Sequence, residues 1–439
     1  MNRAVLILTC TAALFQLSAS AATYYVSLSG SNTPPYDTWE NAATSIQTAV
    51  DAAGDGDNVL VGDGTYAVLS EVVINKGVTV GGLSGRTNTI VDGGNSSRCF
   101  YLAHSNALID GFTIQHGRST GGGGVLCEAG TVQNCVIRDS WAEYYGGGVF
   151  FIGGGLLQNS HVYSNSSWLG GGIYGTNMLV RSCVIDGNLA SWCGGGAVLD
   201  GYCTMVNCSI IGNAATNYGG GVFCMQENEL IQNSIVCLNS AQEGSNYYNL
   251  ALNVSYEYSC TYPPTNAPGN IAEDPGFVDA GGGDYRLVAS SPCIDTGTNS
   301  EGVAESTDVN GRRRLFGRRV DMGAYEAAVE CMEISNTGKV GTAWSAPVQA
   351  QCQLQYCSDL GIGDWVDVGG VITATESRVS VADTNAPGAQ GGYRLIWLRS
   401  EGGAGGGAVA PAPKAAKQAL TPTGRTRPRR SGAPRNGGK

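Results

Sequence analysis

Charged residues are scarce in this chain of 439 residues, at 14% of the total, and histidine occurs three times. Neither a CxxC pair nor a histidine cluster is present, so the usual ligand set of a zinc site is missing and we expect no resident metal or cofactor. After the apolar leader at the N-terminus, no segment approaches the about 18 unbroken apolar residues that a membrane-spanning helix needs. We therefore expect no transmembrane helix once the leader is removed.

The formal net charge of −11 is unevenly distributed. The C-terminal stretch 401–439 carries eight Lys and Arg residues against Glu401 alone, and the rest of the chain has a net charge of −18. An acidic body argues against nucleic acid as a partner. The stretch itself is rich in Gly, Pro and Ala, a composition that cannot bury a core, and we expect it to be disordered.

The first 22 residues, MNRAVLILTCTAALFQLSASAA, combine one Arg, an apolar stretch and small residues at the end. This pattern is typical of a secretory signal peptide cleaved near Ala21 or Ala22. We therefore expect a secreted protein, either extracellular or on an outer-membrane surface.

Triple-glycine runs recur at steps of 24, 24, 24 and 25 residues, and a fixed period of this length indicates a solenoid. Each unit also carries the pattern N-[CS]-x-[IV]-x-x-N, which is short and β-branched and therefore predicts strands. The last glycines of the runs are Gly124, Gly148, Gly172, Gly196 and Gly221. The second pattern covers 134–140, 159–165, 182–188, 207–213 and 233–239.

Aligning the units predicts which residues stack. An inward column of Ile and Val is expected, and a closing column of Ser or Asn, where Asn can adopt a left-handed conformation and share amide hydrogen bonds with the coils above and below. The inward column is Ile137, Val162, Ile185, Ile210 and Val236, and the closing column is Ser140, Asn165, Asn188, Asn213 and Asn239. Such columns favour a parallel β-helix, and glycine triplets at every period exclude helical repeats.

Fourteen of the 15 cysteines follow the leader, and an even number in an oxidising compartment suggests disulfides. Against this, Cys135, Cys183 and Cys208 share a repeat position with Ser160 and Ser234, which favours small buried side chains. A bridge between Cys183 and Cys208 on adjacent coils and a set of buried thiols both remain open.

The spacing of Ile46, Ala49, Val50 and Ala53 predicts a short amphipathic helix that covers the open N-terminal end of the solenoid. Alternating strands after residue 328 predict a small β-sandwich. We expect a leader at 1–22, an N-terminal cap at 23–58, β-helix coils at 59–260, a closing region at 261–327, a β-sandwich at 328–400 and the tail at 401–439.

The coils resemble right-handed parallel β-helix proteins of the pectate-lyase-like type, and the GGG[VI]…N…N rhythm is similar to polymorphic outer-membrane protein repeats. The segments EDPGFVDAGGGDYRLVASSPCIDTG (273–297) and DVNGRRRLFGRRVDMGAYE (308–326) resemble the closing region of secreted choice-of-anchor Q proteins. The resemblance covers about 23–327 and implies an all-β, right-handed parallel β-helix with no single established activity.

β-Helix polysaccharide lyases usually hold Ca²⁺ with several carboxylates beside a basic residue. Here the outward acids Asp139 and Asp186 are expected about 10 Å apart along the axis, too far to share one ion. The RxPxxR pattern of pectate lyases and the NTD, DD and GHG segments of polygalacturonases are absent. His161 is expected to be an exposed sheet residue, so the catalytic residues are unknown and Ca²⁺ enters only if the chain is a lyase.

Aromatic residues precede the glycine triplets by one or two positions and are predicted to form a stripe along one corner of the solenoid. Such a stripe either binds sugar faces by stacking or covers the glycine backbone as part of the structure. The stripe consists of Tyr144, Tyr145, Trp168, Trp192 and Tyr218.

A basic cluster near the end of the β-helix includes Arg313, Arg314 and Arg318, with Asp308 and Glu326 nearby. The cluster either forms ion pairs that fasten the last coil or binds an acidic or sulfated glycan.

Two functions remain for such a protein. The first is a noncatalytic, monomeric rod that binds a polysaccharide or cell-surface glycan or acts as an adhesin. The alternative is a polysaccharide lyase or glycoside hydrolase acting on acidic polysaccharide. The sequence leans toward the first.

Overall fold

The computed structural model of the chain describes residues 21–327, apart from gaps at 289–290, 301, 304–305 and 316–318, and six strands between 332 and 398. The expected signal peptide lies almost entirely outside the described residues, and the basic tail does so completely. None of the helical segments in the described part has the length and apolar character needed to cross a bilayer.

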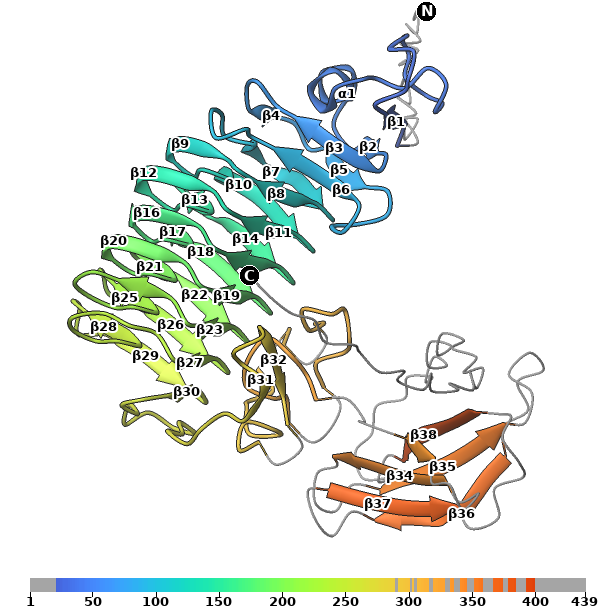
Figure 1. The fold of residues 1–439 in the computed structure, drawn as a ribbon, viewed down its shortest axis with the longest axis vertical. Helices are drawn as coiled ribbons and strands as arrows, with labels where there is room; N and C mark the ends of the chain where they lie inside the picture. The colour runs from blue at the N-terminus through green and yellow to red at the C-terminus, as the bar shows by residue number, and fades with distance from the viewer. Residues whose placement is uncertain are drawn as a thin grey trace, which may run out of the picture. The chain divides into compact units, whose positions relative to one another are not determined.

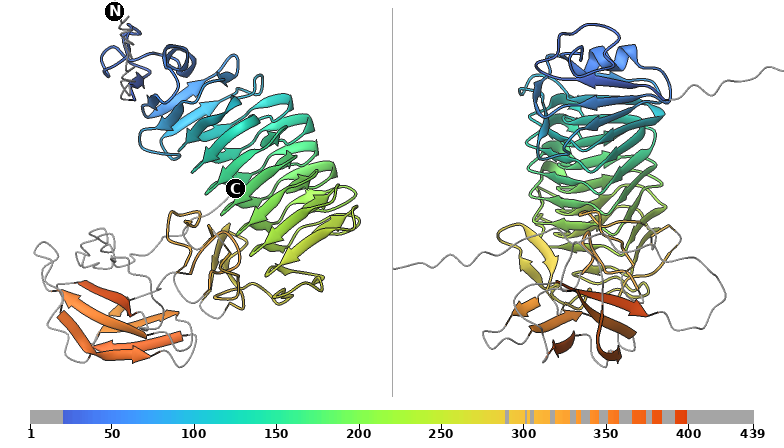
Figure 2. Two further views of the ribbon diagram at one scale, coloured as in Figure 1. Left: turned by 180° about the vertical axis from the view of Figure 1, so that it is seen from behind. Right: turned by 90° about the vertical axis from the view of Figure 1, so that its right-hand side faces the viewer.

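Parallel strands from successive coils stack into three sheets, which confirms the predicted parallel β-helix (Figures 1 and 2). Sheet B has nine strands, each from a different coil. In spatial order they are β3 (Gly64–Ala67), β6 (Thr89–Asp92), β8 (Thr113–Gln115), β11 (Val136–Arg138), β15 (His161–Tyr163), β19 (Val184–Asp186), β23 (Ser209–Ile211), β27 (Ile235–Cys237) and β30 (Cys260–Thr261).

Sheet C has five strands and lies directly before the glycine triplets in each coil. In spatial order they are β9 (Arg118–Gly121), β12 (Trp141–Tyr145), β16 (Ser166–Leu169), β20 (Leu189–Cys193) and β24 (Ala214–Ala215).

Sheet A has sixteen strands and includes the segments that follow each triplet. Its N-terminal part comprises β1 (Thr23–Val26), β2 (Asn58–Val61), β4 (Val72–Ile74), β5 (Thr79–Gly82), β7 (Phe100–Asp110) and β10 (Val125–Gln133). One row continues through β13 (Val149–Phe151), β17 (Ile173–Gly175), β21 (Ala197–Leu199), β25 (Val222–Cys224) and β28 (Tyr247–Asn249). The other continues through β14 (Gly155–Gln158), β18 (Met178–Arg181), β22 (Thr204–Val206), β26 (Glu229–Gln232) and β29 (Val254–Glu257).

The predicted inward column is confirmed. Strand pairing places Ile137, Val162, Ile185, Ile210 and Val236 opposite one another on consecutive coils of sheet B, and all five are fully buried. Since side chains alternate across a strand, the neighbours of each column residue face outward. The outer surface of sheet B is therefore set by the same repeat that fills the core.

The closing asparagines form a buried ladder. The Asn188 side chain donates to the carbonyl of Val162 at 2.9 Å and to Oδ1 of Asn213 at 2.9 Å, and its own Oδ1 accepts from the backbone N–H of Asn165 at 3.0 Å. Stacked amides thus satisfy buried backbone groups at the turn, where unpaired groups would be costly.

The expected left-handed conformation lies elsewhere in the motif. Positive φ values occur at the first position, for example 55° at Asn207, and directly before the closing residue, as at Gly212 with 64°. The closing asparagine keeps its amide for the ladder because its neighbours make the turn.

The glycine triplets permit close contact between coils. A Cβ on Gly195 would lie 2.4 Å from the carbonyl oxygens of both Ala214 and Gly220, so no other residue fits there. The preceding Gly194 has a φ of 67°, which further favours glycine.

A short helix, α1 (Ile46–Ala52), lies within the predicted segment, with Ser45 as its N-cap. Ile46, Ala49 and Val50 are buried, and the helix packs near β1, β2 and β4 at the start of the solenoid. Its apolar face thus covers the first strands.

After the last coil the chain folds back along the outer face of sheet B (Figure 1). It begins with a hairpin of β31 (Phe277–Asp279) and β32 (Asp284–Leu287). Contacts then run from late coils to early ones: the backbone N–H of Thr298 donates to Asn233 at 2.7 Å, the Asn159 amide donates to Thr307 at 2.6 Å, and Arg86 donates to the Val309 carbonyl. The closing region is therefore a strap along the stack.

The six later strands form two three-stranded antiparallel sheets, as expected for a small β-sandwich. One sheet contains β33 (Met332–Ile334), β34 (Val340–Ser345) and β37 (Arg378–Asp383). The other contains β35 (Gln351–Cys357), β36 (Val366–Thr373) and β38 (Gly392–Leu398).

Eleven cysteines lie among the residues described in full, and all are free thiols. The possible Cys183–Cys208 bridge is thus not formed. Burial raises the pKa of Cys135 and Cys208 to about 12, so their reactive thiolate forms are strongly disfavoured at neutral pH.

We predict that iodoacetamide labels these two positions very slowly in the native protein and rapidly after denaturation, as peptide-resolved mass spectrometry would measure. Recovery of a Cys183–Cys208 disulfide peptide without reductant would contradict the free-thiol arrangement.

We predict that Asn188→Ala lowers the free energy of unfolding by about 3 kcal/mol, because it leaves the buried N–H of Asn165 and carbonyl of Val162 without their partner. Chemical denaturation measures the change. Ser191→Ala, on the exposed face of a neighbouring strand, is the control and should change stability by less than about 0.5 kcal/mol. Equal effects of both substitutions on the free energy of unfolding would contradict a stabilising role of the stacked asparagines.

Candidate functional site

The five aromatic candidates divide into two columns. Tyr144, Trp168 and Trp192, each two positions before a glycine triplet, lie on consecutive strands of sheet C and are 44%, 42% and 44% exposed. We call these three residues the aromatic ladder. Tyr145 and Tyr218, one position before their triplets, are half-buried. Only the first group presents open rings to solvent.

The ladder has neighbouring rings that extend the surface. The ring centroids of Trp168 and Trp192 are 6.3 Å apart with an interplanar angle of 34°, so the two indoles are tilted neighbours. Trp141, 37% exposed, begins the strand that carries Tyr144, and the Arg118 guanidinium lies 4.3 Å from its ring centroid. Exposed apolar rings gathered on one sheet are unusual on a soluble surface and mark an interaction site.

Tyr145 and Tyr218 belong to a second, inner column, which packs against aromatic side chains of sheet A. The Tyr145 centroid lies 5.4 Å from that of Phe150 and 4.8 Å from that of Tyr174, and Tyr218 lies 4.8 Å from Tyr248. The Tyr174 hydroxyl donates to Asp200 at 2.6 Å, which fixes its ring. For these two tyrosines, packing rather than an open ligand platform describes the environment.

The residues that cover Tyr145 and Tyr218 were not among the sequence candidates, although the repeat marks most of them. Phe150, Tyr174 and Phe223 each stand two positions after a glycine triplet, where the pattern GGG-[VI]-[FY] recurs. Aligning that position in the repeats shows one aromatic column before the glycines and another after them.

The outward acids of sheet B do not converge. Asp186 accepts from the hydroxyl of Tyr285 at 3.0 Å and pairs with the Nε2 of His161, while Asp139 pairs with Arg138 at 2.6 Å. His161 is thus half-buried and in contact with Asp186 rather than simply exposed, and its ring centroid is 4.6 Å from that of Tyr163. Within the described ranges, no group of three or more His, Cys, Asp or Glu side chains is placed to hold a metal ion.

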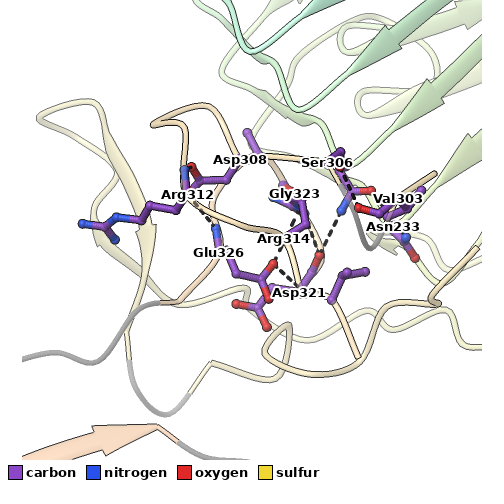
Figure 3. Close-up of polar contacts among 12 residues, drawn as sticks. Asn233, Val303, Ser306, Asp308, Arg312, Arg314, Asp321, Gly323 and Glu326 are labelled. Atoms are coloured by element: carbon purple, nitrogen blue, oxygen red, sulfur yellow. Dashed lines mark hydrogen bonds and ion pairs between the residues drawn. The ribbon is translucent and has the colours of Figure 1, made fainter. Parts of the chain in front are cut away.

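The arginines predicted to bind an anion differ in their exposure. Arg314 is fully buried and donates to the carbonyls of Asp321 at 3.0 Å and Gly323 at 2.7 Å (Figure 3). It is therefore unavailable to a surface anion, which corrects its place among the anion-binding candidates. Arg313 is exposed, and Arg318 lies outside the described residues. Anion binding at Arg313 stays a prediction.

The carboxyl groups of Glu326 and Asp321 lie near Arg314, and Asp295 contacts Asp321. Burial, with Asp321 nearby, raises the pKa of Glu326, and burial also raises the pKa of Asp321, which accepts from the backbone N–H of Asp295 at 2.7 Å. Burial raises the pKa of Asp295 to about 6. Because burial raises these pKa values, the folded strap is favoured when the carboxyls are protonated.

Comparisons with known proteins support no assignment of activity. No family model matches the sequence, and no curated protein matches it. Among solved structures, the chain is similar to the pectate lyase Pel9A, with 17% identity, a TM-score of 0.41 and coverage of 70% of this chain and 97% of that one. It is also similar to the pectin methylesterase PemA from Erwinia chrysanthemi, with 9% identity, a TM-score of 0.33 and coverage of 62% and 94%. Likenesses at this level carry no argument about activity. The parallel β-helix is established by the strand pairing described above. Kinship with choice-of-anchor or outer-membrane repeat proteins stays a prediction.

We predict that the strap loosens as the pH rises. A carboxyl whose pKa is raised in the folded state stabilises that state at low pH, and this contribution is lost as the pH climbs from about 4, where carboxyls titrate in unfolded chains, through the raised values. Hydrogen exchange of residues 306–327 should therefore accelerate between pH 5 and pH 9 beyond its intrinsic dependence.

Glu326→Gln, which keeps the shape and removes the titration, should weaken that acceleration. The exposed Glu143→Gln is the matched control and should leave it unchanged. Identical pH profiles for the native protein and Glu326→Gln would contradict a role for this carboxyl.

Proposed function

We propose that this protein is a noncatalytic glycan-binding protein that uses the aromatic ladder as its contact surface. The observation that carries the proposal is the repetition of an open aromatic ring at one position on three consecutive coils. Aromatic rings bind the apolar faces of sugars by stacking, and Trp and Tyr also offer an N–H or O–H at the ring edge. The expected leader further suggests that the protein meets glycans outside the cell.

A rigid mounting supports this use of the ladder. Each ladder residue directly precedes a residue that packs into the inner column, namely Tyr145, Leu169 or Cys193. The strands themselves are fixed by pairing on both sides. A preorganised surface loses little conformational entropy on binding, which favours affinity.

The enzymatic alternative has less support. In the described part of the chain, the outward acids Asp139 and Asp186 are each engaged with their own partners. A lyase of the calcium-dependent kind needs carboxylates that share one ion beside a free base. The described residues do not offer that arrangement, so binding is the better proposal.

We predict that Trp168→Ala and Trp192→Ala each weaken glycan binding about tenfold or more, as expected for central aromatic contacts. Isothermal titration with soluble oligosaccharides from a glycan array measures the loss. Tyr202→Ala is the matched control, since Tyr202 is 70% exposed and lies outside sheet C.

The control should bind as the native protein does. Unchanged binding in both tryptophan variants, or release of shortened products from the bound glycan, would overturn a noncatalytic role for the ladder.

A further inference from the structure

We propose that the ligand of the aromatic ladder is a neutral, unbranched polysaccharide that lies parallel to the solenoid axis. The inference rests on the proposed function and adds the chemical class and the orientation of the ligand. It depends on the charge of sheet C, the direction of the ladder and the residues that end it.

The outer face of sheet C carries almost no charge. Its five strands contain one basic residue, Arg118, and one acidic residue, Glu143, and the strands β16, β20 and β24 contain neither. The Arg118 guanidinium already lies over the ring of Trp141. A uronate polymer placed here would bring a row of carboxylates to a surface without matching cations, at a desolvation cost that nothing offsets.

The net charge of the rest of the protein also favours neutral glycans over acidic ones. Apart from the basic tail, the chain has a net charge of −18, which repels polyanions over several ångströms at low salt. A neutral sugar meets no such repulsion. Its C–H bonds can face the negative faces of the indole and phenol rings, while its hydroxyls remain hydrated or reach Ser191 and Thr216 on the same surface.

The aromatic ladder determines the direction of the bound glycan. Its rings lie on successive strands of one parallel sheet, which are about 4.8 Å apart, so the first and third rings are separated by about 10 Å along the axis. A glycan running along one strand would contact one ring of the aromatic ladder, whereas a glycan running along the axis contacts all three. Axial binding therefore gives the larger apolar contact.

Polar residues end the ladder. The equivalent position is Thr120 on the preceding coil and Asn217 on the following one. The binding stretch is thus finite, and affinity should increase with oligosaccharide length only until the three rings are covered. Non-specific adsorption to an apolar surface would show no such limit on the increase of affinity with oligosaccharide length.

The test compares hexasaccharides of equal length by isothermal titration: cellohexaose, mannohexaose and xylohexaose against hexagalacturonate, each at low and high NaCl. We expect at least one neutral hexasaccharide to bind at least about tenfold more tightly than hexagalacturonate, with less than about twofold change on addition of salt. A series from disaccharide to hexasaccharide should reach a plateau, and Trp168→Ala should remove the length dependence while Trp168→Phe largely retains it.

The possible failures are distinguishable. Preferred binding of hexagalacturonate that weakens with salt and still requires Trp168 would overturn the neutral class but keep glycan binding by the ladder. Affinity that does not depend on length would overturn the axial orientation. Absence of binding to every glycan, with the native fold verified by circular dichroism, would overturn the proposed function together with this inference. Tyr202→Ala remains the control throughout.

Discussion

Each coil of this solenoid has to satisfy its buried backbone groups with the coils above and below it. The stacked amides of Asn165, Asn188 and Asn213 do so at the turn, and the parallel strand pairing does so elsewhere. A residue that broke the register would leave several buried groups unpaired at once. This constraint holds every coil to the same path, and the positions of the outward side chains follow from it.

The two aromatic columns are a direct consequence of that shared path. Because the coils superpose, a ring at one position in the repeat comes to lie over the ring at the same position in the next coil. The glycines between the columns allow the corner to close tightly, as at Gly195. One column packs against sheet A and the other stays open, so a surface of ordered rings arises without any additional element.

The repeat period predicted the coils, the inward Ile and Val column and the existence of an asparagine column, because these depend on spacing alone. It did not separate Tyr144 from Tyr145, since Tyr145 is covered by Phe150 and Tyr174 from the other side of the glycines. Nor did it show that Arg314 is internal, because its partners Asp321 and Gly323 come from a non-repeating segment. Where the repeat ends, spacing no longer specifies contacts, and the three-dimensional path of the strap has to be seen.

The strap also has a consequence for how such a protein can change over generations. Solenoids commonly gain or lose length by duplication or deletion of whole repeats, because each unit contacts only its neighbours. Here the strap joins Arg86, Asn159 and Asn233, which lie on coils far apart in the stack, through Val309, Thr307 and Thr298. Adding or removing one unit between them would displace these anchors by about 4.8 Å. The length of the strap thus limits the number of coils that it spans, and that number can change only if the strap changes as well.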